Sequence, residues 1–203
     1  MTRKTKEDAL VTRELILDAA ERVFHLRGVS RTSLQEIAKD AGLTRGAIYW
    51  HFENKGDLFH AMMERVTLPM MARMTDISPT DEERPLDKIR NNTASALQQI
   101  ANDPQVRRVF EIATQKVEYV DELLSVRERH IEGRNECIND THRLMQLAQD
   151  KGLIRGDLNL RSATLGLFAL IGGLKYNWLL DPGSFDLEEV GAQTLQSYLK
   201  GLA

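Results

Sequence analysis

Apolar residues recur at the spacing of an α-helix along almost the whole chain of 203 residues. One apolar stripe falls within residues 16–24 and another within residues 34–41. No segment of useful length alternates polar and apolar residues as a half-buried strand does. Because an amphipathic helix must bury its stripe against other helices, the pattern predicts an all-α fold.

Glycines, prolines and capping residues divide the chain into about nine helices. Gly28 is expected to end the first helix in a left-handed conformation. A capping box is expected before the second helix, with the Thr32 hydroxyl and the Gln35 side chain satisfying free N–H groups. Asn54 is expected to cap the fourth helix, and residues 75–85 read as a turn-rich linker. The later helices are expected near 85–101, 104–113, 119–151, 160–180 and 186–201.

Helix size and charge divide the chain into a head, residues 1–54, and a larger body, residues 55–203, connected by the fourth helix. The net charge is −3, yet residues 1–60 carry 10 Lys/Arg against 9 Asp/Glu and the remainder carries 17 against 21. Arg3, Lys4 and Lys6 open the chain with no acid among them. A basic-tipped head on an acidic body fits a protein that contacts polyanions at one end.

Several classes of protein are disfavoured by what the sequence lacks. Cys137 is the single cysteine, so no internal disulfide or multi-cysteine metal site can form, which suits a reducing cytoplasm. The N-terminus has no apolar signal core, and no uninterrupted run of eighteen apolar residues predicts a membrane span. We find no phosphate loop, H-E-x-x-H or Ser/His/Asp pattern. We therefore expect no enzyme, no metal, no cofactor and no membrane contact.

A helix-turn-helix is predicted by the turn at Gly42-Leu43-Thr44, with TRGAIYWHF (44–52) as its second helix. In this motif the second helix enters the DNA major groove. The helical period turns Ile48 and Phe52 inward and leaves Arg45 outside, where it can donate to guanine O6 and N7. Gly46 removes a side chain where the backbone must approach the groove.

The other polar groups around this helix suit the DNA backbone. Lys55 begins the fourth helix, where its charge adds to the helix dipole and attracts phosphate. An isolated aromatic helix is as often core, but the motif and the exposed arginine favour DNA. The predicted DNA-binding residues are Thr32, Ser33, Thr44, Arg45, Gly46, Tyr49, Trp50, His51 and Lys55.

Residues 10–60 resemble the DNA-binding head of the TetR family of bacterial transcriptional repressors. The matching run is TRELILDAAERVFHLRGVSRTSLQEIAKDAGLTRGAIYWHFENKGDLF, and weaker matches at 116–119, 178–180 and 184–187 extend the resemblance to the multidrug-efflux repressor subgroup. It implies a ligand-responsive repressor whose homodimer binds a palindromic operator, with half-sites about 35 Å apart. It also implies a cytoplasmic, nucleoid-associated protein that controls an efflux-pump operon.

A homodimer interface is expected in the last two helices. Residues 160–180 are apolar nearly all round, with small residues at 166, 169, 172 and 173. Such a helix needs partners on more than one side, and two helices from each subunit would form a four-helix bundle. From the residues alone, completion of an internal core is an equal alternative. The family resemblance favours the homodimer.

The fourth helix is rich in methionine, which adapts to irregular apolar ligands but equally fills ordinary cores. The resemblance implies that a bulky, largely apolar drug or antimicrobial binds in the body beneath this helix, moves it and changes the spacing of the heads. Some relatives have an acidic residue at 172 and a basic one at 176, so Gly172 and Tyr176 predict a more apolar site. By position, the ligand-binding residues are Met63, Val66, Met70, Asn92, Ala96, Phe110, Thr114, Cys137, Phe168, Ile171, Gly172 and Tyr176.

Two alternatives keep the helix-turn-helix and change the signal. The chain is then a TetR-like regulator of a metabolic operon, or a regulator that senses oxidation through Cys137. A buried, inert cysteine is commoner than a reactive one. The sequence does not identify the inducer, the operator or the regulated genes.

Overall fold

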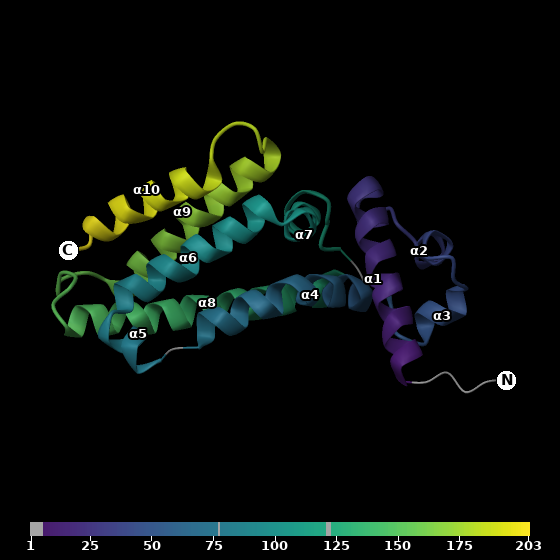
Figure 1. Cartoon of the computed structure of the whole chain (residues 1–203), viewed down its shortest axis with the longest axis horizontal. Coiled ribbons are helices and arrows are strands. Elements are labelled where there is room, and N and C mark those ends of the chain that lie inside the picture. Colours follow the sequence, from purple (N-terminus) through teal and green to yellow (C-terminus); the bar gives the residue numbers. More distant parts are fainter. Residues whose placement is uncertain (1–5, 77, 121–122) are drawn as a thin grey trace. The chain divides into compact units, whose positions relative to one another are not determined.

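The computed structural model describes residues 6–76, 78–120 and 123–203, except the side chains of 73–75, 79 and 81. Arg3, Lys4 and the side chain of Met74 therefore lie outside the described residues. Within the described ranges the fold is all-α, as predicted, with ten helices and no strand (Figure 1). The helices are α1 (Lys6–Arg27), α2 (Leu34–Asp40), α3 (Arg45–Tyr49), α4 (Lys55–Thr75), α5 (Pro79–Glu83), α6 (Pro85–Asn102), α7 (Pro104–Gln115), α8 (Leu124–Asp150), α9 (Leu160–Leu180) and α10 (Leu187–Lys200).

Each predicted helix is present, although the one expected near 119–151 begins only at Leu124, and the linker contains one that was not expected. The short helix α5 lies within residues 75–85, where Pro79 stands at its first position. Proline suits that position because its fixed φ is helical and its missing N–H would be unpaired there anyway. Pro69 lies inside α4, which continues through it to Thr75.

The capping box before α2 uses different residues from those predicted. Ser33 is the N-cap, and its hydroxyl accepts a hydrogen bond from Glu36 N at 3.3 Å. The Glu36 carboxylate accepts one in return from Ser33 N at 2.9 Å. The prediction of Thr32 and Gln35 was wrong by one residue. Thr32 is buried, and its hydroxyl donates to the Gly28 carbonyl at 2.7 Å.

The described chain forms two compact units. Unit 1 comprises the chain up to Thr67 and Arg108–His130, and unit 2 comprises Leu68–Arg107 and Ile131–Ala203. Three helices, α4, α7 and α8, have residues in both units. The units therefore divide the chain differently from the predicted boundary at residue 54, which concerns function and stays a prediction.

Unit 1 is built on one apolar core shared by α1, α2, α3 and the first part of α4. Phe24 of α1 and Phe59 of α4 meet edge to face, with ring centroids 6.0 Å apart, and both are fully buried. Ile37 of α2 and Ile48 of α3 are also fully buried. Gly28 ends α1 with φ +82°, as predicted, because a side chain is strained in this left-handed conformation.

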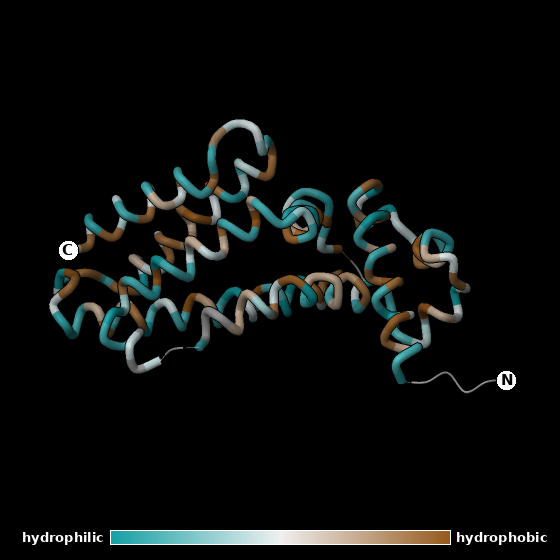
Figure 2. The backbone as a smooth tube through the Cα atoms, viewed as in Figure 1, coloured by the Kyte–Doolittle hydropathy of each residue, from teal (hydrophilic) through white to brown (hydrophobic). Residues whose placement is uncertain are grey.

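Unit 2 has its own core, to which α6, α8, α9 and α10 contribute, and hydrophobic positions recur along each helix (Figure 2). Two glycines let α10 approach its neighbours. A Cβ at Gly166 of α9 would collide with the Tyr198 hydroxyl, and one at Gly191 would collide with the Leu97 side chain of α6. Close packing of these helices therefore explains both glycines.

Among the described residues, one helix, α9, is long and apolar enough to cross a membrane by length and composition. Part of this apolarity serves the core, since Leu167, Trp178 and Leu179 are buried. Other apolar and small residues form a stripe along one side of the helix that is exposed except at the half-buried Gly172. We call it the α9 stripe; it consists of Leu165, Ala169, Gly172, Tyr176 and Leu180.

Candidate functional site

The turn between α2 and α3 holds the second helix of the predicted motif by local hydrogen bonds. Gly42 has φ +67°, and Leu43 N donates to Ala38 O at 2.9 Å. Thr44 is the N-cap of α3, its hydroxyl accepting from Ala47 N at 3.2 Å. Ile48 and Phe52 are 0% and 3% exposed, which confirms that they face inward. These contacts fix the outer face of α3.

That outer face carries an arginine and two aromatic rings. Tyr49 is 46% exposed and Trp50 is 72% exposed. Arg45 donates from Nη2 to Tyr49 Oη at 2.8 Å, and its guanidinium carbon lies 5.2 Å from the Tyr49 ring centroid. The half-buried His51 lies edge to face with Trp50, with ring centroids 4.5 Å apart. Donor groups and aromatic surface are thus presented together on the outer face of α3.

Gly46 is exposed at the start of α3, and the fold does not require it to be glycine. Its φ is not positive, and a Cβ built there would meet only the Thr44 hydroxyl, at 3.9 Å. Gly28 and Gly42, by contrast, are needed for their backbone conformation. The fold therefore leaves Gly46 unexplained, and its role in approach to DNA stays a prediction.

The start of α2 presents the Ser33 hydroxyl, which donates to Glu36 Oε2 at 2.9 Å. Hydrogen bonds from the Ser33 N–H and hydroxyl lower the pKa of Glu36, and the charge of Arg27 lowers it further. Arg27 also forms an ion pair with the Glu36 carboxylate. Thr32 is buried, so its side chain is not on the surface of unit 1.

At the start of α4, Asn54 is the predicted cap, its Oδ1 accepting from Asp57 N at 2.9 Å. Lys55 is half-buried and donates from Nζ to Ser30 O, at 3.2 Å, in the loop before α2. Lys55 therefore ties α4 to the helix-turn-helix in this structure. Its contact with phosphate stays a prediction.

The predicted ligand-binding residues are distributed over both units. Met63 and Val66 of α4 are buried in unit 1, which also contains Phe110 and Thr114 of α7. In unit 2, three of the twelve, Met70, Asn92 and Ala96, line one pocket of about 340 Å³. The sequence did not single out the other residues that line it, which are Asp76, Lys88, Asn91, Ser95 and Gln99.

Helix α9 separates its four predicted ligand residues. Phe168 and Ile171 are half-buried, and Ile171 packs against the core of unit 2. Gly172 and Tyr176 lie on the α9 stripe, where Tyr176 is 47% exposed and a Cβ at Gly172 would meet nothing. Their position favours contact with another helix over contact with the same ligand.

Burial shifts the pKa values of Cys137 and Lys175, two titratable side chains of unit 2. Burial raises the pKa of the Cys137 thiol, and the charges of Asp140 and Glu136 raise it further. Lys175 of α9 was missed by the sequence analysis, because a lone lysine in an apolar helix carries no motif. The residue is half-buried, and desolvation by the surrounding protein lowers the pKa of its amine.

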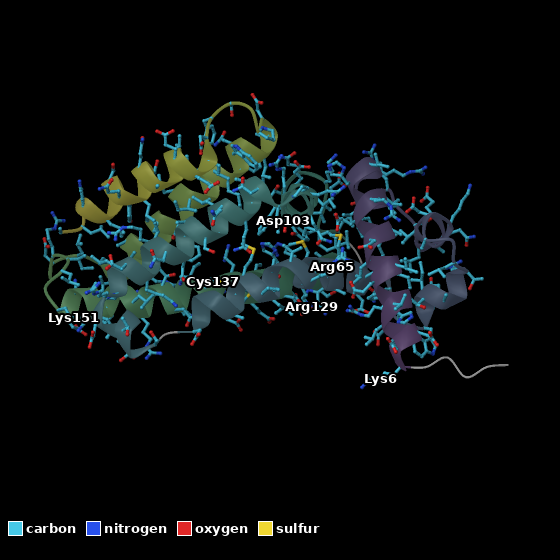
Figure 3. The ribbon with its side chains drawn as sticks, in the orientation of Figure 1. Lys6, Arg65, Asp103, Arg129, Cys137 and Lys151 are labelled. Atoms are coloured by element: carbon cyan, nitrogen blue, oxygen red, sulfur yellow. The ribbon has the colours of Figure 1, made fainter. Side chains whose placement is uncertain are left out.

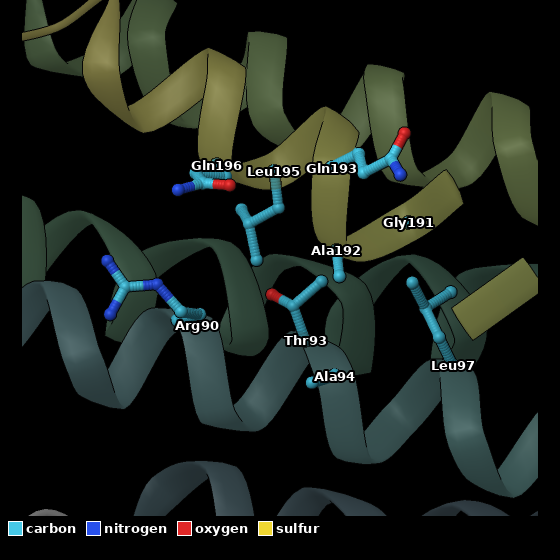
Figure 4. Close-up of a pocket in the computed structure, with 9 residues that line it drawn as sticks. All are labelled: Arg90, Thr93, Ala94, Leu97, Gly191, Ala192, Gln193, Leu195 and Gln196. Carbon is cyan, nitrogen blue, oxygen red and sulfur yellow. The ribbon is translucent and has the colours of Figure 1, made fainter. Parts of the chain in front are cut away.

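A second pocket, a groove of about 310 Å³, lies between α6 and α10 of unit 2 (Figure 4). Leu97 and Leu195 make it mainly apolar, and Arg90 lies at one end. None of the predicted ligand residues lines this groove. The groove lies where α10 comes close to α6 at Gly191.

Comparisons with known proteins agree with this architecture. Residues 16–62 match the family described as bacterial regulatory proteins, tetR family, and residues 84–203 match the MAATS-type transcriptional repressor C-terminal region. The HTH-type transcriptional regulator TtgR of Pseudomonas putida is 38% identical over 193 residues, covering 92% of this chain and 89% of that protein.

Two solved structures are also similar. NalD, the secondary repressor of the MexAB-OprM multidrug efflux pump in Pseudomonas aeruginosa, has a TM-score of 0.83 and 35% identity, covering 97% of each chain. A complex of triclosan with SmeT, the repressor of the Stenotrophomonas maltophilia multidrug efflux pump SmeDEF, has a TM-score of 0.84 and 32% identity, covering 94% of this chain and 91% of that one. The chain therefore belongs to the TetR family of bacterial transcriptional repressors and is related to the regulators of multidrug efflux.

Proposed function

We propose that a homodimer of this chain binds a palindromic operator through α3 and leaves it when a bulky, mostly apolar molecule binds the body. The observation that carries the proposal is the outer face of α3. Arg45, Tyr49 and Trp50 are exposed there beside a glycine that the fold does not need. The protein acts in the cytoplasm by binding alone, without catalysing a reaction.

Homodimerisation is supported by the α9 stripe. Its members follow each other at i, i+4, i+7, i+11 and i+15, so they lie along one side of the helix. Large apolar side chains on this stripe are exposed in the single chain, with Leu165 at 44% and Leu180 at 56%. A second copy that covers the stripe buries this surface and pairs two helix-turn-helix motifs for the two half-sites.

The class of inducer is supported by the relatives and by the residues of unit 2. SmeT forms a complex with triclosan. The pocket that contains Met70, Asn92 and Ala96 offers apolar surface beside amide groups, the combination that small-molecule sites use. We infer that this chain takes ligands of the same class and controls an efflux-pump operon.

The direct test is a gel shift with the DNA upstream of the protein's own gene, at two salt concentrations. Sequence-specific binding that weakens steeply with salt is expected, because each phosphate contact releases counterions. Triclosan should release the complex. A protein that shifts no DNA at low salt is not an operator-binding repressor.

Gly46→Ala should move stability and operator binding in opposite directions. Alanine stabilises a helical position over glycine by about 0.5–1 kcal/mol, and the added Cβ meets no close neighbour in the fold. In the groove the same methyl group keeps the backbone away from DNA, so operator affinity should fall. Thermal unfolding and gel shift on one preparation measure both. Unchanged operator affinity would show that α3 does not approach DNA at residue 46.

Cys137 should react slowly with alkylating agents, which argues against the redox alternative. Only the thiolate is nucleophilic, and burial raises the pKa of this thiol. At pH 7 the folded protein should therefore be alkylated by iodoacetamide more slowly than the same protein unfolded in urea. Cys137→Ser should leave operator binding unchanged. Loss of operator binding on mild oxidation of the wild type, but not of Cys137→Ser, would restore the redox alternative.

A further inference from the structure

A buried carboxylate in unit 1 is held by two arginines from two different helices. Glu21 of α1 is 5% exposed. Its Oε2 accepts a hydrogen bond from Nη2 of Arg65, on α4, at 2.8 Å. Its Oε1 forms an ion pair with Nε of Arg108, on α7, also at 2.8 Å. Figure 3 labels Arg65 on α4. Each carboxylate oxygen is thus assigned to one helix.

Because of this arrangement, the position of α1 depends on α4 and α7 together. A carboxylate out of water is stable only while it is paired, and losing one partner of a buried ion pair is strongly destabilising. Arg65 is committed further, since its Nη1 also donates to Asp18 Oδ1 at 2.7 Å and to Glu14 Oε2 at 3.2 Å. A shift of either α4 or α7 therefore breaks one of the two arginine contacts of Glu21 unless α1 follows.

Helix α7 continues along α1 beyond this ion pair. His25 Nε2 lies 2.8 Å from Glu111 Oε2, and Val29 N donates to Lys116 O at 2.8 Å. Glu21 and His25 are four apart on α1 and lie on one side of it, and Val29 follows the end of this helix. Val29 is next to Ser30, whose carbonyl accepts from Lys55 at the start of α4. Both helices therefore contact α1 and the loop that leads to α2.

The same two helices extend into unit 2. On α4, Leu68 is the first residue of unit 2 and comes three residues after Arg65. On α7, two adjacent arginines belong to different units. Arg108 belongs to unit 1 and pairs with Glu21, whereas Arg107 belongs to unit 2. The Arg107 guanidinium carbon lies 4.8 Å from the Trp178 ring centroid, on α9, and its Nη2 donates to Ala101 O.

We propose that Glu21, Arg65 and Arg108 form the joint through which ligand binding in the body changes the position of the DNA-binding head. The role in ligand response rests on the proposed function, whereas the mechanical coupling does not. The joint transmits because one carboxylate cannot stay paired with both arginines when α4 and α7 move apart. Removing the carboxylate charge uncouples the head from both helices.

The coupling is tested without DNA or ligand by hydrogen exchange of the full-length protein. Arg107→Gln loosens α7 in unit 2 and should speed exchange of the α2 amides, Leu34–Asp40, in unit 1. In a Glu21→Gln background, or in Arg108→Gln if that variant folds better, the same change should have little further effect on α2. Asp18→Asn is the matched control, because it removes a carboxylate from Arg65 and leaves Glu21. In this background, the effects of Asp18→Asn and Arg107→Gln on α2 exchange should multiply. Two results would overturn the joint. One is that the effects of Arg107→Gln and Glu21→Gln on α2 exchange multiply; the other is that Arg107→Gln leaves the exchange of the α2 amides unchanged.

The regulatory consequence is tested by the fold change in operator affinity that saturating triclosan causes. Coupling between sites in proteins is typically about 5–150-fold. Glu21→Gln should reduce the fold change at least about fivefold while Asp18→Asn keeps it. An unchanged response in Glu21→Gln would contradict the proposal. Failure of triclosan to release the wild type counts against the proposed inducer class, and hydrogen exchange then decides the joint by itself.

Discussion

Ala169→Glu should convert the protein to a monomer and reduce its affinity for the operator by about 10²–10⁴-fold. Ala169 is exposed at the middle of the α9 stripe, between Leu165 and Gly172. A charge there would have to be buried in the proposed interface with no partner, which is strongly unfavourable. Without the dimer, two half-sites no longer act as one, and the avidity of paired binding, about 10²–10⁴-fold, is lost.

Light scattering after gel filtration measures the first effect, because a monomer of 23.1 kDa is easily distinguished from its dimer. Gel shift measures the second. Gln98→Glu is the matched control: it adds the same charge at an exposed position of α6, and it should stay dimeric with wild-type operator affinity. Circular dichroism confirms that both variants are folded. If Ala169→Glu remains a dimer with full operator affinity, the α9 stripe is not the interface.

Arg45→Ala should weaken operator binding by about 1–3 kcal/mol in each half-site and relax the choice of base at one position. In the free protein Arg45 lies against Tyr49, to which it donates at 2.8 Å. On binding, we expect this contact to a neutral hydroxyl to be exchanged for a bidentate contact to guanine. The measurement is the affinity of wild type and variant for operators that carry each base at each half-site position.

Two further variants separate the roles of the two side chains. Tyr49→Phe removes only the hydroxyl that holds Arg45, so it should keep base discrimination at the Arg45 position. Arg45→Lys keeps the charge without the two-pronged geometry, so it should retain more affinity than discrimination. If Arg45→Ala weakens all operator sequences by the same factor, Arg45 contacts phosphate and another residue of α3 reads the base.

The ends and phases of the helices could be predicted because they depend on local spacing. The stripe within residues 16–24 needed a partner, and α1 buries Ile16, Ala20 and Phe24 completely. Gly28 and Gly42 were recognisable as stops because a left-handed residue is a local requirement, met at φ +82° and +67°. The phase of α3 followed from the 3.6-residue period, which turned Ile48 inward and left Arg45 outside.

Choices between neighbours depended on groups far along the chain or across the fold. In the sequence, Thr32 and Ser33 were equally good caps for α2. Ser33 is the cap in the structure, because the Thr32 hydroxyl donates to the Gly28 carbonyl instead. Gly166 and Gly172 looked alike as small residues of one apolar helix. In the structure, Gly166 packs closely against Tyr198, whereas Gly172 lies on the α9 stripe with nothing near its Cβ position.

The sequence by itself therefore determined an all-helical chain with a helix-turn-helix and its outward face, since these follow from the period of a single helix. Only the tertiary structure brought Glu21, Arg65 and Arg108 together from three helices. A charged residue on a helix carries no signal for its partner, because ion pairing depends on distance in space and not on spacing along the chain.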